Sequence, residues 1–352
     1  MSEPTTPPKS LCILRLSAIG DACHVVPIVR TLQQTWPETA ITWVIGHTEA
    51  RLMSLLPGVE FITIDKRSLF GSIRALRTAL RGRRFDVLLH MQLALRSSLY
   101  AALIPARLRL GFDRARAREL QWLFTNRRIL ARENEHVLDS FFGFTAALGL
   151  VARRLEWQLP LPDEATARAR AQIPDGLPTL IVSPCSSHRL RNWSVERYAA
   201  VIAHAVRHHY LQVLLCGAPN DYERDFGAAI ARAAGVPIKN LIGTDTLPQL
   251  LALLARATAL LTPDSGPAHM ATMVGTPVIG LYAATRLERS GPYLSRQWCV
   301  DRYEQAAQRF RGRAASQLPW AEKIEEPGVM DLIETEAVIA RLDELLAMPL
   351  LR

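Results

Sequence analysis

The segment Asp264-Ser265-Gly266-Pro267-Ala268-His269 joins a predicted buried strand to a predicted helix. Pro267 suits the first turn of a helix, and Gly266 lets the backbone approach a ligand closely. The N–H groups at a helix start attract anions, pyrophosphate above all. The carboxylate of Asp264 could accept hydrogen bonds from hydroxyls of a sugar or ribose, and His269 could donate a hydrogen bond to phosphate. An ordinary capped turn, with Ser265 as the N-cap, explains the same residues about as well.

A second strand-to-helix turn, Ser17-Ala18-Ile19-Gly20-Asp21, carries a carboxylate at the start of a helix. Such a group can accept the proton of a substrate hydroxyl, which is the task of a general base. The aspartate could instead only stabilise the helix N-terminus, and this fragment alone favours that simpler role. No Gly-x-Gly-x-x-Gly pattern follows the strand, so a nicotinamide-dependent dehydrogenase is disfavoured.

A polar loop, residues 186–193, follows another predicted strand and precedes a helix that Ser194 would cap. The hydroxyls of Ser186 and Ser187 and the guanidinium of Arg191 could bind a diphosphate, because arginine forms bidentate hydrogen bonds with phosphate. A solvated loop is an equally good interpretation.

Basic residues are concentrated in the N-terminal half. Residues 1–150 hold 20 Lys and Arg against 12 Asp and Glu, whereas the rest of the chain holds 22 against 21. This asymmetry indicates an acidic partner, which could be nucleic acid, an anionic membrane surface or an acidic substrate. The basic groups singled out are Lys66, Arg67, Arg114, Arg116, Arg118, Arg127 and Arg128, with His136 beyond them.

Short apolar runs alternate with amphipathic stretches, which predicts βαβ units and parallel sheets with helices on both faces. The first half has predicted strands at 11–16, 41–45, 61–64 and 85–89, and helices at 25–32, 49–56 and 69–80. The second half has predicted strands at 179–183, 212–216, 241–242, 259–262 and 278–282, and helices at 195–208, 221–234, 247–255 and 267–274.

The same pattern predicts the domain organisation. A proline-rich connector around residues 159–178 separates an N-terminal domain, 1–165, from a C-terminal domain, 166–330. Residues 331–352 form a closing helix that we expect to pack back on the N-terminal domain. Two doubly wound domains leave a cleft between them, and ligands bind at the carboxyl ends of their strands.

Composition excludes several classes of protein. With 49% hydrophobic and 21% charged residues, the chain is neither disordered nor collagen-like. No apolar run approaches the ~20 residues needed to span a bilayer, and the first ten residues do not resemble a signal peptide, so a cytoplasmic location is expected. The five cysteines are widely spaced without a Cys-x-x-Cys pair, which favours reduced thiols over disulfides or a zinc site.

Together these motifs resemble glycosyltransferase family 9, the lipopolysaccharide heptosyltransferases. Residues 14–21 (LRLSAIGD) are similar to the family's opening strand and turn. Residues 264–269 (DSGPAH), followed by 275–282 (GTPVIGLY), are similar to its donor-site signature. The resemblance covers nearly the whole chain and weakens after about Arg296. It implies an α/β fold of the GT-B type, in which two facing Rossmann-like domains bind the acceptor N-terminally and the nucleotide sugar C-terminally.

The resemblance also implies roles for single residues. Asp21 corresponds to the catalytic base that deprotonates the acceptor hydroxyl, and inversion follows by direct displacement, without a metal or another cofactor. Arg191 stands where the family commonly has lysine, two residues before Trp193. The implied donor-binding residues are Ser186, Ser187, Arg191, Asp221, Asp264, Ser265, Gly266, Pro267 and His269. The implied acceptor-binding residues are Gly20, Lys66, Arg67, Arg118 and His136.

The implied partners are ADP-heptose and the anionic inner core of lipopolysaccharide, accepting through Kdo or the first heptose. The basic half would also touch the anionic inner leaflet of the inner membrane, where each Lys or Arg contributes about 1 kcal/mol. A monomer is expected, and no nucleic acid partner.

The sequence leaves two alternatives open. Another GT-B enzyme, either a transferase for a different nucleotide sugar or an epimerase, would share the fold, although an epimerase leaves the basic half unexplained. A nucleic-acid-binding protein would use the same arginines with Phe112, Trp122 and Phe124 beside them, but it leaves residues 264–269 without a role.

Overall fold

The computed structural model describes residues 6–348. The chain divides into two compact units, one ending at Pro160 and the other beginning at Leu161. The predicted boundary at 165 falls inside helix α6 (Asp163–Gln172), a few residues further along the chain. Residues 1–5 of the predicted first domain and 349–352 of the predicted closing segment lie outside the described residues.

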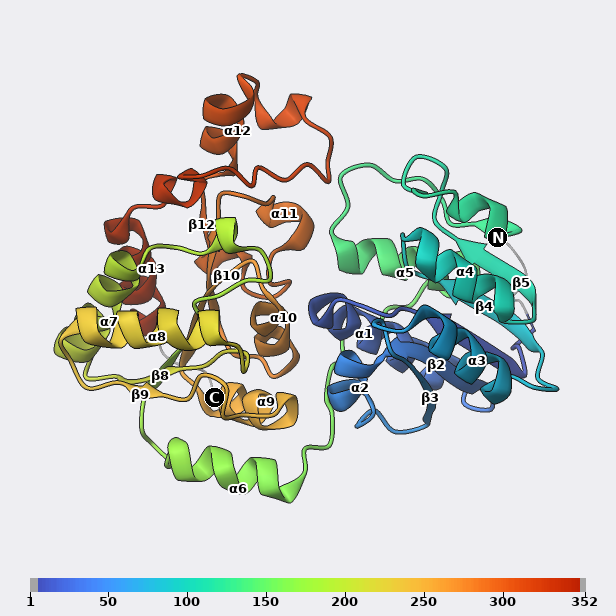
Figure 1. Cartoon of the computed structure of the whole chain (residues 1–352), viewed down its shortest axis with the longest axis horizontal. Coiled ribbons are helices and arrows are strands. Elements are labelled where there is room, and N and C mark those ends of the chain that lie inside the picture. The colour runs from blue at the N-terminus through green and yellow to red at the C-terminus, as the bar shows by residue number, and fades with distance from the viewer. Residues whose placement is uncertain (1–5, 349–352) are drawn as a thin grey trace. The chain divides into compact units, whose positions relative to one another are not determined.

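The N-terminal unit contains one sheet of six parallel strands in the order β3-β2-β1-β4-β5-β6 (Figure 1). Leu11 to Leu14 in the central strand β1 have no exposed surface, as expected for a strand covered on both faces. The strands are β1 (Ser10–Leu14), β2 (Ala40–Gly46), β3 (Val59–Ile64), β4 (Phe85–His90), β5 (Ala106–Gly111) and β6 (Arg127–Arg128).

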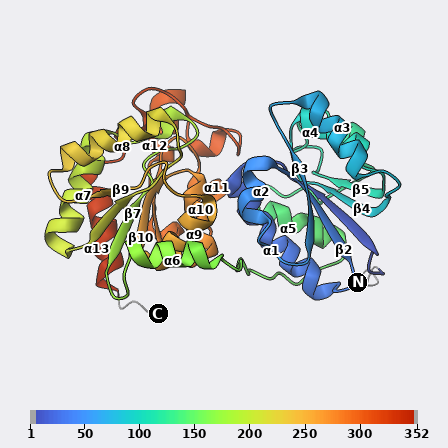
Figure 2. The same ribbon diagram turned by 60° about the horizontal axis from the view of Figure 1, so that its bottom comes forward.

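Helices cover both faces of this sheet. In Figure 2, α3 and α4 lie on one face, and α1 and α5 lie on the other. The helical elements are α1 (Ile19–Thr35), α2 (His47–Met53), α3 (Leu69–Ala79), α4 (Leu95–Leu103), the 3-10 turn η1 (Gln121–Phe124) and α5 (Val137–Ala147).

The C-terminal unit repeats this plan with a parallel sheet in the order β12-β11-β10-β7-β8-β9. Ser194 caps α7 and Asn220 caps α8, each accepting a hydrogen bond from the backbone N–H three residues later. The strands are β7 (Thr179–Val182), β8 (Gln212–Leu215), β9 (Lys239–Asn240), β10 (Ala259–Pro263), β11 (Val278–Tyr282) and β12 (Val300–Asp301). The α-helices are α6, α7 (Val195–His209), α8 (Asp221–Ala234), α9 (Leu247–Arg256), α10 (Gly266–Met273), α11 (Leu287–Ser290), α12 (Tyr303–Arg311) and α13 (Thr335–Ala347). The 3-10 turns are η2 (Arg189–Arg191), η3 (Arg296–Trp298), η4 (Ala315–Gln317) and η5 (Val329–Leu332).

Each sheet reverses its strand order at one place, between β1 and β4 in the first unit and between β7 and β10 in the second. Doubly wound sheets bind ligands at this switch point, outside the carboxyl ends of the strands. The turn containing Asp21 follows β1, and the turn containing Asp264 follows β10. The topology therefore places each predicted motif at the ligand-binding edge of its own sheet.

The closing helix packs within its own unit. Val338, Leu342 and Leu345 of α13 are buried in the core of the C-terminal unit, and α13 packs against α7. The indole N–H of Trp193 donates to the carbonyl of Ile333 just before this helix, over 3.1 Å. The apolar face of this helix is therefore buried within the C-terminal unit, a partner that an amphipathic pattern does not reveal. Packing on the N-terminal domain stays a prediction.

One strand also differs from its prediction. The edge strand β9 is Lys239–Asn240, two residues before the predicted apolar pair 241–242. Ile242 is buried where the chain turns away from the sheet, so its apolar character reflects core packing rather than strand pairing. Within residues 6–348, no helix has the length and apolar character needed to cross a bilayer.

Candidate functional site

The loop between β1 and α1 is held by hydrogen bonds from the neighbouring strands. Gln92, which follows β4, accepts from the backbone N–H groups of Leu16 and Ser17 through its side-chain oxygen, at 2.9 and 3.3 Å. The Trp43 indole N–H donates to the carbonyl of Arg15 at 3.0 Å. The start of α1 is therefore fixed relative to β2 and β4 at the switch point.

Arg15 orients the carboxylate of Asp21. Its guanidinium forms an ion pair with Asp21 Oδ2, donates to the carbonyl of Met91 at 2.6 Å, and lies 5.2 Å from the ring centre of Phe141. The backbone N–H of Ala18 reaches the same oxygen at 3.4 Å. Oδ2 is thus an anchored acceptor.

The second oxygen of Asp21 has a different environment. No group from residues 6–348 donates a hydrogen bond to Oδ1, and the side chain is 30% exposed. A carboxylate with one oxygen fixed and the other open is arranged to accept a proton from an incoming hydroxyl. Helix-end stabilisation by Oδ2 and proton acceptance by Oδ1 are compatible here.

Lys66 lies close to this loop because Gly46, which separates them, has no side chain. Its ammonium pairs with both oxygens of the buried Glu49, at 2.8 and 2.9 Å. A Cβ added at Gly46 would lie 2.4 Å from the Leu16 carbonyl oxygen, from Glu49 Oε2 and from Lys66 Cε. The Asp21 loop and the Lys66–Glu49 ion pair therefore both contact the backbone of Gly46, where a side chain would not fit.

We expect Gly46→Ala to destabilise the N-terminal unit by about 1–3 kcal/mol, because the added methyl overlaps a backbone oxygen that cannot move aside. Urea unfolding followed by circular dichroism measures this change. Gly143→Ala is the matched control, since its Cβ would come no nearer than 3.2 Å to the flexible end of Ile129. Equal stability of the two variants would show that residues 16, 46 and 66 are not in close contact.

The other predicted acceptor residues have different surroundings. Gly20 is buried in the first turn of α1. Arg67 is exposed and pairs with Asp65, and its hydrogen bonds lower the pKa of that carboxyl to about 2. Arg118 is exposed and makes no side-chain hydrogen bond or ion pair with any described residue. His136 is a buried N-cap of α5 that accepts from the Leu138 N–H at 3.1 Å.

In the C-terminal unit, the turn after β10 leaves the start of α10 uncapped by a side chain. Ser265 occupies the N-cap position, but its hydroxyl hydrogen bonds to the Thr262 hydroxyl at 2.7 Å instead of to the helix. Ser265 is thus the N-cap residue, as the capped-turn alternative expects, but its side chain does not supply the capping hydrogen bond. The helix begins at Gly266, with Pro267 next. An uncapped helix N-terminus of this kind favours an anion.

Arg191 connects the loop 186–193 to this turn. Its guanidinium donates to Asp264 Oδ2 at 3.2 Å and twice to Glu325 Oε1, at 2.8 and 2.6 Å. The Ser186 hydroxyl donates to the carbonyl of Asp264 at 2.7 Å. The loops after β7 and β10 and the segment around Glu325 thus form one polar cluster at the switch point.

The charges in this cluster influence one another. Burial raises the pKa of Glu325, but the hydrogen bonds and positive charge of Arg191 outweigh it, so the net pKa is lowered. Burial, reinforced by the charge of Arg191, lowers the pKa of Lys323. The cluster combines two acids with two bases, and Arg191 must share its donors between protein carboxylates and any bound anion.

The remaining predicted donor residues are not all part of this cluster. Ser187 is exposed, and His269 is buried in α10. Asp221 is 96% exposed at the start of α8 and pairs with Arg224. The next residue, Tyr222, reaches the loop instead: its hydroxyl accepts from the Asn192 side chain at 3.1 Å, and Arg189 lies 4.1 Å from its ring centre.

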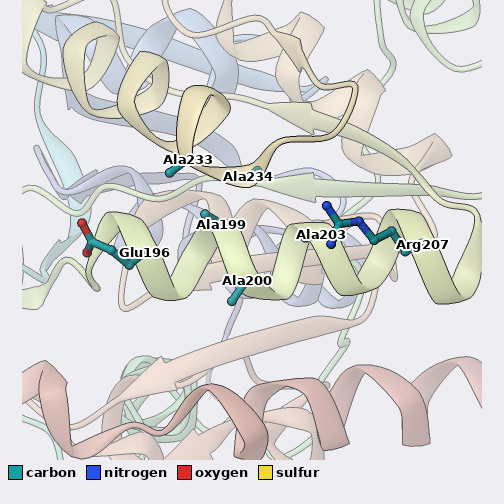
Figure 3. A pocket seen from close by; sticks show the side chains of 7 residues that line it. All are labelled: Glu196, Ala199, Ala200, Ala203, Arg207, Ala233 and Ala234. Carbon is teal, nitrogen blue, oxygen red and sulfur yellow. The ribbon is translucent and has the colours of Figure 1, made fainter.

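A shallow groove of about 330 Å³ between α7 and α8 lies apart from these residues. In Figure 3 its floor consists of small side chains, with Glu196 and Arg207 at the two ends. The small residues are Ala199, Ala200, Ala203, Ala233 and Ala234. The groove follows the contact between two packed helices and contains none of the predicted site residues.

Comparison with known proteins identifies the family. Residues 73–318 match the family model described as glycosyltransferase family 9 (heptosyltransferase). Lipopolysaccharide core heptosyltransferase OpsX of Haemophilus influenzae is 39% identical over 341 residues, covering 97% of this chain and 98% of that protein. The chain belongs to glycosyltransferase family 9.

Solved structures agree with the fold of this family 9 enzyme. A family 9 glycosyl transferase from Veillonella parvula superimposes with a TM-score of 0.79 at 20% identity, covering 98% of this chain and 99% of that one. Escherichia coli heptosyltransferase WaaC with ADP gives 0.70 at 19% identity, covering 96% and 99%. The predicted GT-B fold is confirmed. Of the two classes considered from the sequence, enzyme and nucleic-acid-binding protein, the comparisons show the enzyme.

The sequence motifs missed three residues of this family 9 enzyme that the structure places in its candidate sites. Arg15 holds Asp21, Glu325 holds Arg191, and burial and the charge of Arg191 lower the pKa of Lys323. Arg15 has a local signal, because a charged residue directly follows the buried apolar residues 11–14 of β1. Glu325 and Lys323 have none, since their segment carries no recognisable motif.

Proposed function

We propose that this chain transfers heptose from ADP-heptose to the inner core of lipopolysaccharide, with inversion at the anomeric carbon and without a catalytic metal. The acceptor class is suggested by OpsX, a lipopolysaccharide core heptosyltransferase. The donor is suggested by WaaC, which has been solved with ADP and with ADP-2-deoxy-2-fluoro heptose. The acceptor sugar would be Kdo or the first heptose.

The observation that carries the mechanism is the asymmetric carboxylate of Asp21. Oδ2 is held by Arg15, while Oδ1 is open and has no donor among residues 6–348. In the proposed reaction, Oδ1 takes the proton of the acceptor hydroxyl as its oxygen attacks the anomeric carbon of heptose. The C1–O bond to the diphosphate breaks at the same time, and ADP leaves with the bonding electrons. Arg15 is a positioning residue for this step.

The C-terminal unit supplies the donor end of the reaction. Negative charge grows on the diphosphate as the glycosidic bond breaks, so donors directed at it stabilise the transition state more than the ground state. The uncapped first turn of α10 and the guanidinium of Arg191 are suited to this role. One carboxylate oxygen of Asp264 pairs with Arg191, which leaves the other oxygen to accept a hydrogen bond from a hydroxyl of the sugar.

A donor panel tests this proposal. The enzyme is incubated with a truncated core acceptor and with ADP-heptose, UDP-sugars or GDP-sugars in turn, in a buffer containing EDTA. We expect product only with ADP-heptose as the donor. The rate should be the same with and without EDTA, and the product should have the anomeric configuration opposite to that of the donor. Retained configuration would contradict direct displacement, and loss of activity in EDTA at unchanged folding would contradict metal independence.

The surface around η1 fits the proposed contact with an anionic membrane. Leu120, Trp122 and Leu123 are exposed there, beside the helix α4 with exposed Leu95 and Leu99. The exposed bases of this surface are Arg114, which lies 5.7 Å from the Trp122 ring centre, and Arg118, Arg127 and Arg128. Apolar side chains framed by arginines match a membrane interface, where chains insert and cations meet lipid headgroups.

We expect Leu123→Glu to weaken binding to vesicles with anionic lipid by at least about tenfold, because it removes an inserting side chain and adds a repelled charge. Co-sedimentation with vesicles measures binding. Val151, 90% exposed outside this surface, provides the control Val151→Glu. Equal losses in both variants would contradict docking through η1, and turnover of a soluble truncated acceptor should be unchanged in both.

A further inference from the structure

Three side chains of types that can ligate a metal converge between α7 and α13. His204 Nε2 and His209 Nε2, both from α7, lie 2.7 and 2.6 Å from the same oxygen, Oδ1 of Asp343 on α13. The three ligand atoms all lie within 4.8 Å of one another, and each residue is partly buried. The proposed transfer reaction uses none of them.

The position of this cluster separates it from the donor turn. The C-terminal end of α7 is followed directly by β8, so His209 lies at the amino-terminal edge of the sheet. The turn after β10 lies at the carboxyl edge. The cluster is therefore at the opposite end of the parallel strands, where it joins the closing helix to the rest of the unit.

The ligand types select a class of ion. Two imidazoles and one carboxylate suit zinc and neighbouring transition metals, whereas magnesium and calcium prefer all-oxygen sites. An aspartate carboxyl group is ordinarily ionised at neutral pH, as a metal ligand must be.

The geometry needs only a small adjustment. Tetrahedral zinc with bonds of about 2.0–2.1 Å separates its ligand atoms by about 3.3 Å. The carboxylate must therefore move outward by less than about 1 Å from its present hydrogen bonds, and the two Nε2 atoms, which lie within 4.8 Å of each other, must adjust to the same separation. The Asp343 side chain is 44% exposed and has room to move. Each Nε2 must present its lone pair to the ion, so its proton moves to Nδ1 or to solvent.

We propose that His204, His209 and Asp343 bind one zinc-class ion, with water completing the coordination, and that the ion fastens α13 to α7. The closing helix already packs through Val338, Leu342 and Leu345. A metal bond across the same pair of helices adds a link that the unfolded chain lacks, so its binding free energy stabilises the folded state.

The test uses the full chain without an affinity tag, stripped of metal by a chelator. Zinc is titrated by calorimetry and thermal unfolding, and cobalt by its visible absorption. We expect one saturable site, a tetrahedral cobalt spectrum, and a rise in unfolding midpoint of about 5–10 °C at zinc 100-fold above the dissociation constant.

Three variants separate metal binding from ordinary packing. Asp343→Asn keeps a hydrogen-bond acceptor of the same shape, and should weaken zinc binding at least about tenfold with little change in the metal-free midpoint. His209→Gln should do the same. His47→Ala removes an exposed histidine in the N-terminal unit and should leave binding unchanged. Absence of saturable zinc binding, or equal binding by wild type and Asp343→Asn, would overturn the proposal.

Discussion

Replacing Asp21 with asparagine should lower kcat by about 10²–10⁴-fold, the usual contribution of a general base. Asparagine keeps the side-chain shape and can still accept from Arg15 and the Ala18 N–H, so the loop should remain in place. It cannot take up a proton, however. Binding of ADP-heptose, measured by calorimetry, should therefore be unchanged while the rate of ADP release falls.

Asp139→Asn is the matched control for this experiment. Asp139 also lies in the first turn of a helix in the N-terminal unit, pairs with an arginine, Arg153, at 2.7 Å, and is 26% exposed against 30% for Asp21. Its substitution should leave kcat close to that of the wild type. Unchanged turnover in Asp21→Asn, or an equal loss in both variants, would remove Asp21 from the role of base.

Replacing Arg191 with alanine should lower kcat/KM by about 10²–10³-fold, because it removes a donor aimed at the developing charge of the diphosphate. The change also leaves Asp264 and Glu325 without their shared cation, which raises the electrostatic cost of bringing a diphosphate near them. Steady-state kinetics with ADP-heptose, together with the affinity for ADP, measures the two consequences.

Two further variants define the role of Arg191. Arg191→Lys restores the charge but not the planar fork that holds Glu325 and Asp264 together, so we expect a partial recovery. Arg302→Ala removes an arginine of the same unit that pairs with Glu334 at 3.0 Å, and should leave kcat/KM unchanged. A wild-type kcat/KM in Arg191→Ala with an unchanged unfolding midpoint would contradict a donor-site role.

The sequence was informative where local pattern decides structure. Buried parallel strands are short apolar runs, so the strands that carry both turns were predicted within one or two residues of their observed ends. Because loops at the carboxyl ends of such strands bind ligands, the turns around Asp21 and Asp264 could be selected from the sequence.

Long-range pairing was not predictable in the same way. Glu325 lies 134 residues from Arg191, and neither residue carries a signal that points to the other. An amphipathic pattern predicts which face of α13 is apolar, but it does not predict that α7 covers this face. The metal-binding cluster was missed for the same reason, since Asp343 and His209 are also 134 residues apart.

Mass spectrometry of a lipopolysaccharide core acceptor after incubation with ADP-heptose tests the central proposal most directly. Parallel reactions with an acceptor ending in Kdo and one already bearing a heptose would identify the acceptor sugar. We predict that one of them gains the mass of a single heptose residue, with ADP released in equal amount. If folded enzyme adds nothing to either acceptor from ADP-heptose, or modifies them only from another nucleotide sugar, the proposed function is wrong.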